Sequence, residues 1–200
     1  MSTIQSIHAS EILDSRGRPT VRATCTLAGG ATASASVPSG ASTGAAEAWE
    51  LRDGDPKRYR GLGCRKAVAN VNGEIRTAIT GREFATQADL DNLLIALDGT
   101  PNKARLGANA ILAVSIAFAR AVAAERATPL YLHFASLLGR VPETLPRLTI
   151  NLFSGGKHAG KQVAIQDVLA VPVSPRTIDE SLVMMSEVYN TAAEIIFQRY

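Results

Sequence analysis

The side chains best suited to chemistry lie in the last third of the chain, where an amide and a carboxylate interrupt an apolar segment. Gln166 and Asp167 stand together inside VAIQDVLAVPV. A buried carboxylate needs partners, because an unpaired buried charge is costly. Two interpretations stay open. The pair lies on an exposed edge strand or turn, or it forms the floor of a site in which neighbouring groups tune a carboxylate for catalysis.

A histidine in a glycine-rich loop is the second candidate. His158 lies in FSGGKHAGK (153–161), and a histidine can transfer protons near neutral pH, although a lone loop histidine is more often a surface residue. The loop superficially resembles a phosphate-binding loop. It lacks the Gly-Lys-Ser/Thr ending and the strand-to-helix context, so we reject that motif. We interpret His8 and His133, in strand-like and helix-like stretches, as structural residues.

The third candidate is a run of small residues, VPSGASTGAAE (37–47), which contains Ser39 and Ser42. Such a run cannot build a core. It is either a flexible connector or a mobile lid whose small residues let the backbone approach a ligand. A charge cluster follows it, and such clusters are usually solvated. Its members are Glu47, Glu50, Arg52, Asp53 and Asp55.

The elements that position these residues fall into two segments. Alternating apolar residues predict strands over 4–9 and 20–27, and a hairpin signal leads to a third strand over 31–37, which gives an antiparallel meander. Helical spacing begins at Cys64, Thr86 can cap the next helix, and DGTPN (98–102) predicts a turn. An alanine-rich helix over 108–125 and a short one from Pro129 to Leu138 follow, ended by Gly139.

The pattern changes near residue 140. Strands are predicted over 147–152 and 163–173, and a capping box from Thr177 to Glu180 opens a helix. One face of that helix is apolar, with Ile178, Leu182, Met185, Tyr189, Ala192, Ile195 and Ile196. The 60 residues of this second segment are few for an independent core.

Composition narrows the class of protein. The chain has 200 residues, 46% hydrophobic residues, 20% charged residues and a net charge of +3, which is ordinary for a globular protein. The basic residues are scattered and aromatic residues are few, so we expect no nucleic-acid partner. Apolar runs such as 110–119 are too short to span a bilayer. Two cysteines and no signal peptide favour the cytosol, with both thiols reduced.

Several blocks, in matching order and spacing along the whole chain, resemble the enolase (phosphopyruvate hydratase) family. They are EILDSRGRPTV (11–21), VPSGASTG (37–44), ELRDGD (50–55), LDGTPNKARLGANAILAVS (97–115), PLY (129–131), SGGKHAG (154–160) and EVY (187–189). The resemblance implies an α+β N-terminal domain over 1–140, with a three-stranded antiparallel meander plus helices. The first strands and helix of an enolase-type α/β barrel would follow over 141–200.

The resemblance also implies an activity, the magnesium-dependent dehydration of 2-phosphoglycerate to phosphoenolpyruvate by a homo-oligomer, a dimer or higher. VPSGASTG would be the lid, with Ser39 as a ligand of a second Mg²⁺. His158 would be a catalytic residue on the substrate side, and Gln166 would contact the substrate. Asp167 takes a catalytic, substrate-binding position where the family has Glu, which makes the side chain one methylene shorter.

Other features of the family find no match. The lysine base, the acid-side glutamate and three carboxylate ligands of Mg²⁺ match nothing within 1–200, so we expect the 200-residue chain alone to be inactive. Ser154 stands where the family has Asn. Asp167 and Ser154 motivate an alternative, a divergent paralogue acting on a related phosphorylated or phosphonate acid. The unmatched residues motivate another alternative, a noncatalytic binding protein on the same scaffold.

Overall fold

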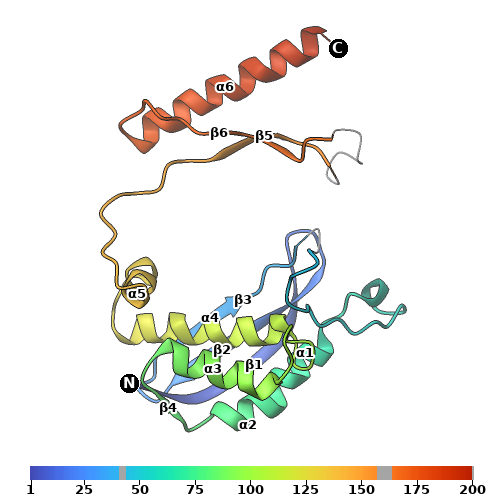
Figure 1. The fold of residues 1–200 in the computed structure, drawn as a ribbon, viewed down its shortest axis with the longest axis vertical. Coiled ribbons are helices and arrows are strands. Elements are labelled where there is room, and N and C mark those ends of the chain that lie inside the picture. The colour runs from blue at the N-terminus through green and yellow to red at the C-terminus, as the bar shows by residue number, and fades with distance from the viewer. Residues whose placement is uncertain (41–43, 157–163, 200) are drawn as a thin grey trace. The chain divides into compact units, whose positions relative to one another are not determined.

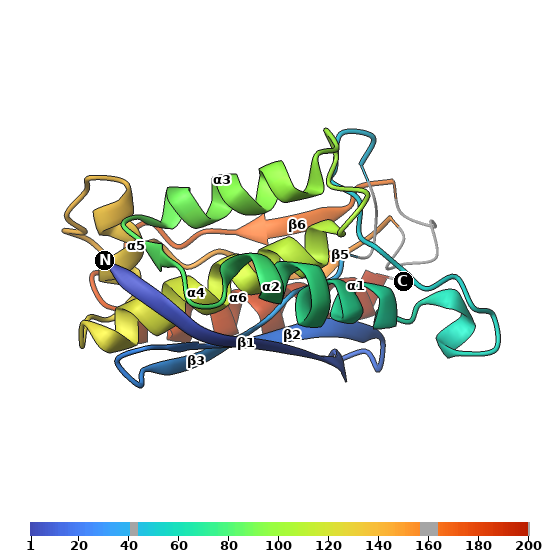
Figure 2. The same ribbon diagram turned by 90° about the horizontal axis from the view of Figure 1, so that it is seen from below.

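The computed structural model describes residues 1–40, 44–156 and 164–199, which divide into two units, Met1–Val141 and Pro142–Tyr200 (Figure 1). The first unit is an antiparallel sheet with helices packed over one face (Figure 2). Its elements are β1 (Ser2–Leu13), β2 (Pro19–Leu27), β3 (Thr32–Ser36), a 3₁₀ turn (Tyr59–Gly61), α1 (Arg65–Asn70), a π-helical turn (Val71–Ile75), α2 (Arg76–Ile79), β4 (Glu83–Phe84), α3 (Gln87–Asp98), α4 (Ala108–Glu125) and α5 (Leu130–Leu137).

The sheet has the order β3-β2-β1-β4. The predicted three-stranded meander is confirmed, but the prediction missed β4, which adds a fourth strand at the edge by pairing Ser2 with Phe84 and Thr3 with Glu83. Two residues are too short to show the alternation that identifies a strand. The alternation that predicted β2 is confirmed, since every second residue is fully buried: Val21, Ala23, Cys25 and Leu27.

Strand β1 contains an irregularity that its burial pattern reveals. Ser2 and Ile4 are buried, and then the buried positions shift to Ile7 and Ala9. The register between β1 and β2 slips between Ile4 and Ser6. An extra residue at a bulge reverses the alternation of side chains. The slip therefore keeps apolar residues of both halves of β1 on the covered face.

The alanine-rich helix α4 covers β2 and β3. Its bounds agree with the prediction, and eleven of its residues are buried. Small side chains let the helix backbone approach the sheet closely. Strand β3 also has small residues at this contact, Ala33 and Ala35. Among the described residues, α4 is the one helix long and apolar enough to cross a membrane, and 61% of it is buried inside the protein. The length of α4 therefore does not exclude a membrane span, contrary to our expectation that the apolar runs are too short. The burial of α4 against the sheet explains its apolar composition.

The helix predicted from Cys64 onward is interrupted. The π-helical turn separates α1 from α2, and the Asn72 side chain within it accepts a hydrogen bond from Ala9 N at 2.7 Å and donates one to Ala9 O at 2.9 Å. This pairing ties the turn to β1. The predicted cap of α3 is confirmed as a capping box, with the Thr86 hydroxyl accepting from Asp89 N and the Asp89 carboxylate accepting from Thr86 N.

The DGTPN turn is built on Asp98, which is 2% exposed. Its carboxylate accepts hydrogen bonds from Thr100 N at 3.0 Å, from Leu106 N at 2.7 Å and from the Thr100 hydroxyl. Burial by itself would raise the pKa of Asp98, but these donors outweigh it and the pKa is lowered. The ionised carboxylate thus joins the end of α3 to the approach to α4.

The second unit contains β5 (Ile150–Ser154), β6 (Asp167–Ala170) and α6 (Ile178–Arg199). The two strands pair antiparallel, with Ser154 opposite Asp167, and both are shorter than predicted or shifted. Thr177 caps α6 by accepting from Glu180 N at 3.1 Å. Of the predicted apolar face of α6, Met185 is the buried member, while Ile178, Leu182, Tyr189, Ile195 and Ile196 are about half exposed.

Candidate functional site

The segment after β3 is fixed where it leaves the sheet. Val37 N donates to Val21 O at 2.9 Å, and the buried Thr20 hydroxyl donates to Val37 O at 2.6 Å. Val37 is itself 5% exposed. Two residues later, Ser39 lines a cavity of about 510 Å³. The anchored strand end therefore sets the position at which the Ser39 hydroxyl is presented.

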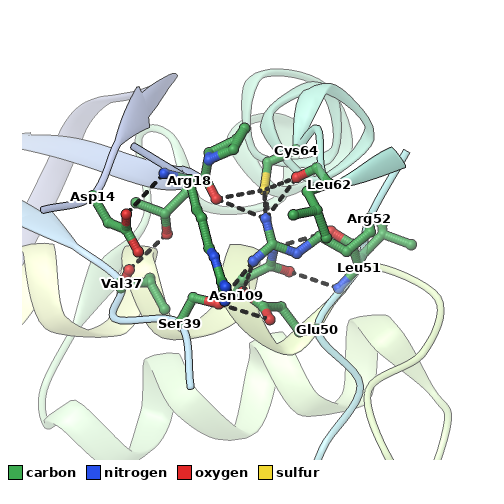
Figure 3. Close-up of polar contacts among 12 residues, drawn as sticks. Asp14, Arg18, Val37, Ser39, Glu50, Leu51, Arg52, Leu62, Cys64 and Asn109 are labelled. Atoms are coloured by element: carbon green, nitrogen blue, oxygen red, sulfur yellow. Dashed lines mark hydrogen bonds and ion pairs between the residues drawn. The ribbon is translucent and has the colours of Figure 1, made fainter. Parts of the chain in front are cut away.

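The Ser39 hydroxyl is held by an ion pair (Figure 3). It accepts a hydrogen bond from Arg52 Nη2 at 2.8 Å and donates to Glu50 Oε2 at 3.2 Å, while Arg52 Nη2 lies 2.6 Å from Glu50 Oε1. The backbone carbonyl of Ser39 accepts from Arg16 Nη2. We call Ser39, Glu50 and Arg52 the serine clamp. It places a neutral oxygen between a cation and an anion at the rim of the cavity.

The other half of the Arg52 guanidinium ties the clamp to the core. Arg52 Nη1 donates to Pro19 O and Leu62 O, both at 2.7 Å, and lies 3.0 Å from Cys64 Sγ. Burial raises the pKa of the Cys64 thiol to about 11, so the thiol stays protonated and can accept the guanidinium N–H. With 18% of its side chain exposed, Arg52 is a fixed residue and not part of a solvated face.

The clamp segment is also fastened to the start of α4 (Figure 3). The Asn109 side chain accepts from Leu51 N at 3.2 Å and donates to Leu51 O at 3.1 Å, and Ala108 N donates to Trp49 O at 2.8 Å. Gly107 makes this approach possible. A Cβ there would lie 2.6 Å from both Asn109 Oδ1 and Leu51 Cβ, and its φ of +97° strains any other residue.

The remaining charges next to the clamp organise the neighbouring loop. Asp53 accepts from the backbone N–H groups of Arg65 and Lys66 at the start of α1. Glu11 makes a two-fold ion pair with Arg58 and accepts from Cys64 N. The hydrogen bonds from Arg58 are the largest cause of the lowered pKa of Glu11.

The prediction of a solvated charge cluster was therefore wrong for its central members. Glu50, Arg52 and Asp53 are paired, whereas Glu47 and Asp55 are exposed. Sequence reasoning also missed Arg16 and Asn109. A signal for Asn109 exists, since it is a polar side chain at the start of an otherwise apolar helix.

A second group of candidate residues lies in the second unit, at the start of β6. Asp167 Oδ1 accepts hydrogen bonds from the Ser154 hydroxyl at 2.7 Å and from Asn151 Nδ2 at 3.0 Å. Gln166 is exposed, and its carbonyl accepts from Gly155 N at 2.6 Å. The structure thus brings Gln166, Asp167 and Ser154 together across β5 and β6. His158 lies outside the described residues.

Comparison with known protein families identifies the architecture. Residues 4–134 match the family model of the enolase N-terminal domain, and residues 142–200 match that of the enolase C-terminal TIM barrel domain. The chain belongs to the enolase family. It carries an enolase-type α+β N-terminal domain, and β5, β6 and α6 are the start of an enolase barrel.

Membership of the enolase family places the chain in a family of lyase-type enzymes that generally use Mg²⁺. The described residues contain no group of three or more His, Cys, Asp and Glu side chains that could hold a metal ion. Ser39 and Glu50 offer oxygen atoms, which Mg²⁺ prefers. However, the Arg52 guanidinium touches both of them, so the serine clamp in this arrangement does not fit a cation.

Proposed function

We propose that this protein is a phosphopyruvate hydratase, which dehydrates 2-phosphoglycerate to phosphoenolpyruvate. The observation that carries the proposal is the position of Ser39 at the rim of the cavity, two residues past an anchored strand end, in a chain that matches both enolase domains in order. Loss of water from 2-phosphoglycerate removes a proton beside the carboxylate and releases a hydroxyl group. The proposed substrate is therefore a small anionic acid.

The roles proposed for this chain's residues are positional. The serine clamp holds the Ser39 hydroxyl at the cavity rim until a stronger partner replaces Arg52 and Glu50. Gln166 presents an amide to the substrate, and Asp167 presents a carboxylate oriented by Ser154 and Asn151. His158 stays a predicted substrate-side residue. Family membership supports Mg²⁺ as the cofactor, and when bound it would stabilise developing negative charge on the substrate.

The test is the absorbance of phosphoenolpyruvate formed from 2-phosphoglycerate with Mg²⁺ by the product of the whole gene. Ser39→Ala should lower kcat/KM by about 10²-fold, the scale for losing one group that supports the transition state. Ser36→Ala is the matched control, because Ser36 is exposed at the end of β3, and it should leave the rate unchanged. A wild-type protein that forms no phosphoenolpyruvate would refute the proposal, as would equal rates for the two variants.

A second candidate is a divergent paralogue that acts on a related phosphorylated or phosphonate acid. The observation that favours it is the hydrogen bond between Ser154 and Asp167, since the sequence departs from the family pattern at both of these positions. The shorter carboxylate of Asp167 has a neighbouring hydroxyl as its partner. Such a coupled pair indicates a site adjusted as a unit, and assays with phosphonate analogues would reveal the altered preference.

A further inference from the structure

The π-helical turn between α1 and α2 contains the one Asn-Gly step of the sequence, Asn72–Gly73. In such a step the backbone nitrogen of the glycine can attack the side-chain carbonyl carbon of the asparagine, because glycine has no Cβ to hinder the approach. Every other asparagine of the chain precedes a residue with a side chain. Asn72 is therefore the asparagine most open to spontaneous deamidation.

The fold does not require a glycine at position 73. The turn continues the helical backbone from α1 into α2, and Gly73 is not among the glycines with a left-handed φ. A Cβ at this position would meet no heavy atom within 4 Å. A glycine inside a helix lowers the folding equilibrium constant about two- to fivefold relative to alanine. Packing and backbone conformation thus leave Gly73 unexplained, whereas it determines the reactivity of Asn72.

The Asn72 side chain takes the place of a neighbouring strand at the edge of β1. Strand β4 pairs with β1 at Ser2 and Thr3. Further along β1, Asn72 Oδ1 accepts a hydrogen bond from Ala9 N at 2.7 Å, and Asn72 Nδ2 donates one to Ala9 O at 2.9 Å. The carboxamide therefore satisfies both backbone polar groups of one β1 residue, as a paired strand would.

The same two hydrogen bonds protect Asn72 in the folded chain. Both ends of the carboxamide are held, so its carbon reaches the Gly73 nitrogen only after the side chain has left Ala9. Breaking two hydrogen bonds of ordinary net strength makes this opening unfavourable by about 30-fold. Deamidation of the folded chain should therefore be slower than that of the unfolded chain by at least this factor.

We propose that Asn72–Gly73 is a deamidation site that records the opening of the π-helical turn. When the turn opens, the Gly73 nitrogen bonds to Asn72 Cγ, the Cγ–Nδ2 bond breaks, and ammonia leaves with the amide proton of Gly73. Water then opens the cyclic imide at either of its carbonyls, which gives aspartate or isoaspartate. The reaction needs water alone as co-reactant. The site is independent of the proposed hydratase activity and of the serine clamp.

Either product weakens the attachment of the turn to β1. An aspartate carboxylate has no N–H, so Ala9 O loses its donor and faces a negative charge. Isoaspartate adds a methylene to the backbone, which disturbs the regular hydrogen bonding of the helical turn. A chain that has opened and reacted is thus marked irreversibly, and it is less stable than an unreacted chain.

The first test needs no variant. The whole chain is incubated at mildly alkaline pH, either folded or in urea, and then digested with trypsin. Deamidation is measured by mass spectrometry on the peptide 67–76, which contains Asn72 and, as an internal control, Asn70. The rate at Asn72 should be at least about 30-fold higher in urea, and Asn70 should stay intact. Equal rates at Asn72 in the two conditions, or equal rates at Asn70 and Asn72, would overturn the proposal.

The second test uses variants. Gly73→Ala should slow deamidation in urea without lowering Tm. Asn72→Asp reproduces one product and should lower Tm by about 2–10 °C. The matched control is Asn92→Asp, which makes the same change of charge at an exposed position of α3 and should leave Tm unchanged. Equal Tm for the two aspartate variants would refute the proposed loss of stability.

Aged wild-type chain gives the same comparison if Asn72→Asp does not fold. The fraction deamidated at Asn72 should unfold at a lower urea concentration than the unreacted fraction. Coincident unfolding of the two fractions would overturn the proposal, as would deamidation of Gly73→Ala in urea at the wild-type rate.

Discussion

Asn109 should be worth more to this fold than its place in an alanine-rich helix suggests. Asn109→Ala removes two hydrogen bonds to Leu51, on its N–H and on its carbonyl. At about 1 kcal/mol each they sum to about 2 kcal/mol. Alanine returns up to about 0.7 kcal/mol through its better helix propensity. The expected loss is therefore about 1–2 kcal/mol of the free energy of unfolding.

Urea denaturation followed by circular dichroism measures this loss, and a thermal scan should show a fall of about 3–8 °C in Tm. The fluorescence of Trp49, the chain's single tryptophan, adds a local readout two residues from Leu51. In Asn109→Ala the Trp49 transition should precede the helical one, because Leu51 joins the serine clamp to α4. The two transitions should coincide in the wild type.

The control is Asn92→Ala, because Asn92 is exposed on α3 and alanine there should be neutral or slightly stabilising. If Asn109→Ala and Asn92→Ala unfold at the same urea concentration, the two hydrogen bonds to Leu51 contribute nothing. The reasoning that α4 positions the clamp segment would then fail.

Three further outcomes follow from the same contacts. Arg58 holds the pKa of Glu11 below its ordinary value of 4.5, so the ion pair stabilises the fold above pH 4.5, and this stabilisation is lost as the pH falls through the lowered pKa. Glu11→Gln should therefore weaken the fall of Tm at acidic pH, and an unchanged fall of Tm would contradict this reasoning. Gly107→Ala should destabilise by about 1–3 kcal/mol or more, since its Cβ would meet Leu51 at 2.6 Å; a wild-type urea midpoint would show that the backbone adjusts freely. If Asp167 acts in the active site, Asp167→Asn should lower kcat/KM by about 10²-fold, and Asp167→Glu should raise kcat on 2-phosphoglycerate unless the site is adapted to another substrate. Equal kcat/KM for the wild type and both variants would rule this role out.

Local signals allowed much of the fold to be predicted. Helix α4 begins after Gly107 and is rich in apolar residues, and α3 begins after Thr86 with its own capping residues. The start of each helix is therefore recorded in nearby residues. The β2 face likewise shows in its alternation. Strand β4 and the π-helical turn were missed, because two residues show no period and because the turn depends on the distant contact of Asn72 with β1.

The candidate site was less accessible to sequence reasoning. The clamp joins Ser39 to Arg52, and Arg52 in turn needs the carbonyls of Pro19 and Leu62. Partners so far apart along the chain share no fixed spacing, so the sequence alone predicted a solvated cluster of charges around Glu50 and Arg52. Residue type and local pattern singled out Ser39, Gln166, Asp167 and His158 as candidates. Their roles came from family resemblance and stay predictions.

The order of the elements along the chain has a consequence for synthesis on the ribosome. Strands β2 and β3 are complete by residue 36, but α4, the helix that covers them, starts only about 70 residues later, which takes about 4–14 s at about 5–20 residues per second. During this interval the nascent meander has no cover for the apolar residues of β2. A slowly translated stretch before α4 would lengthen that exposure.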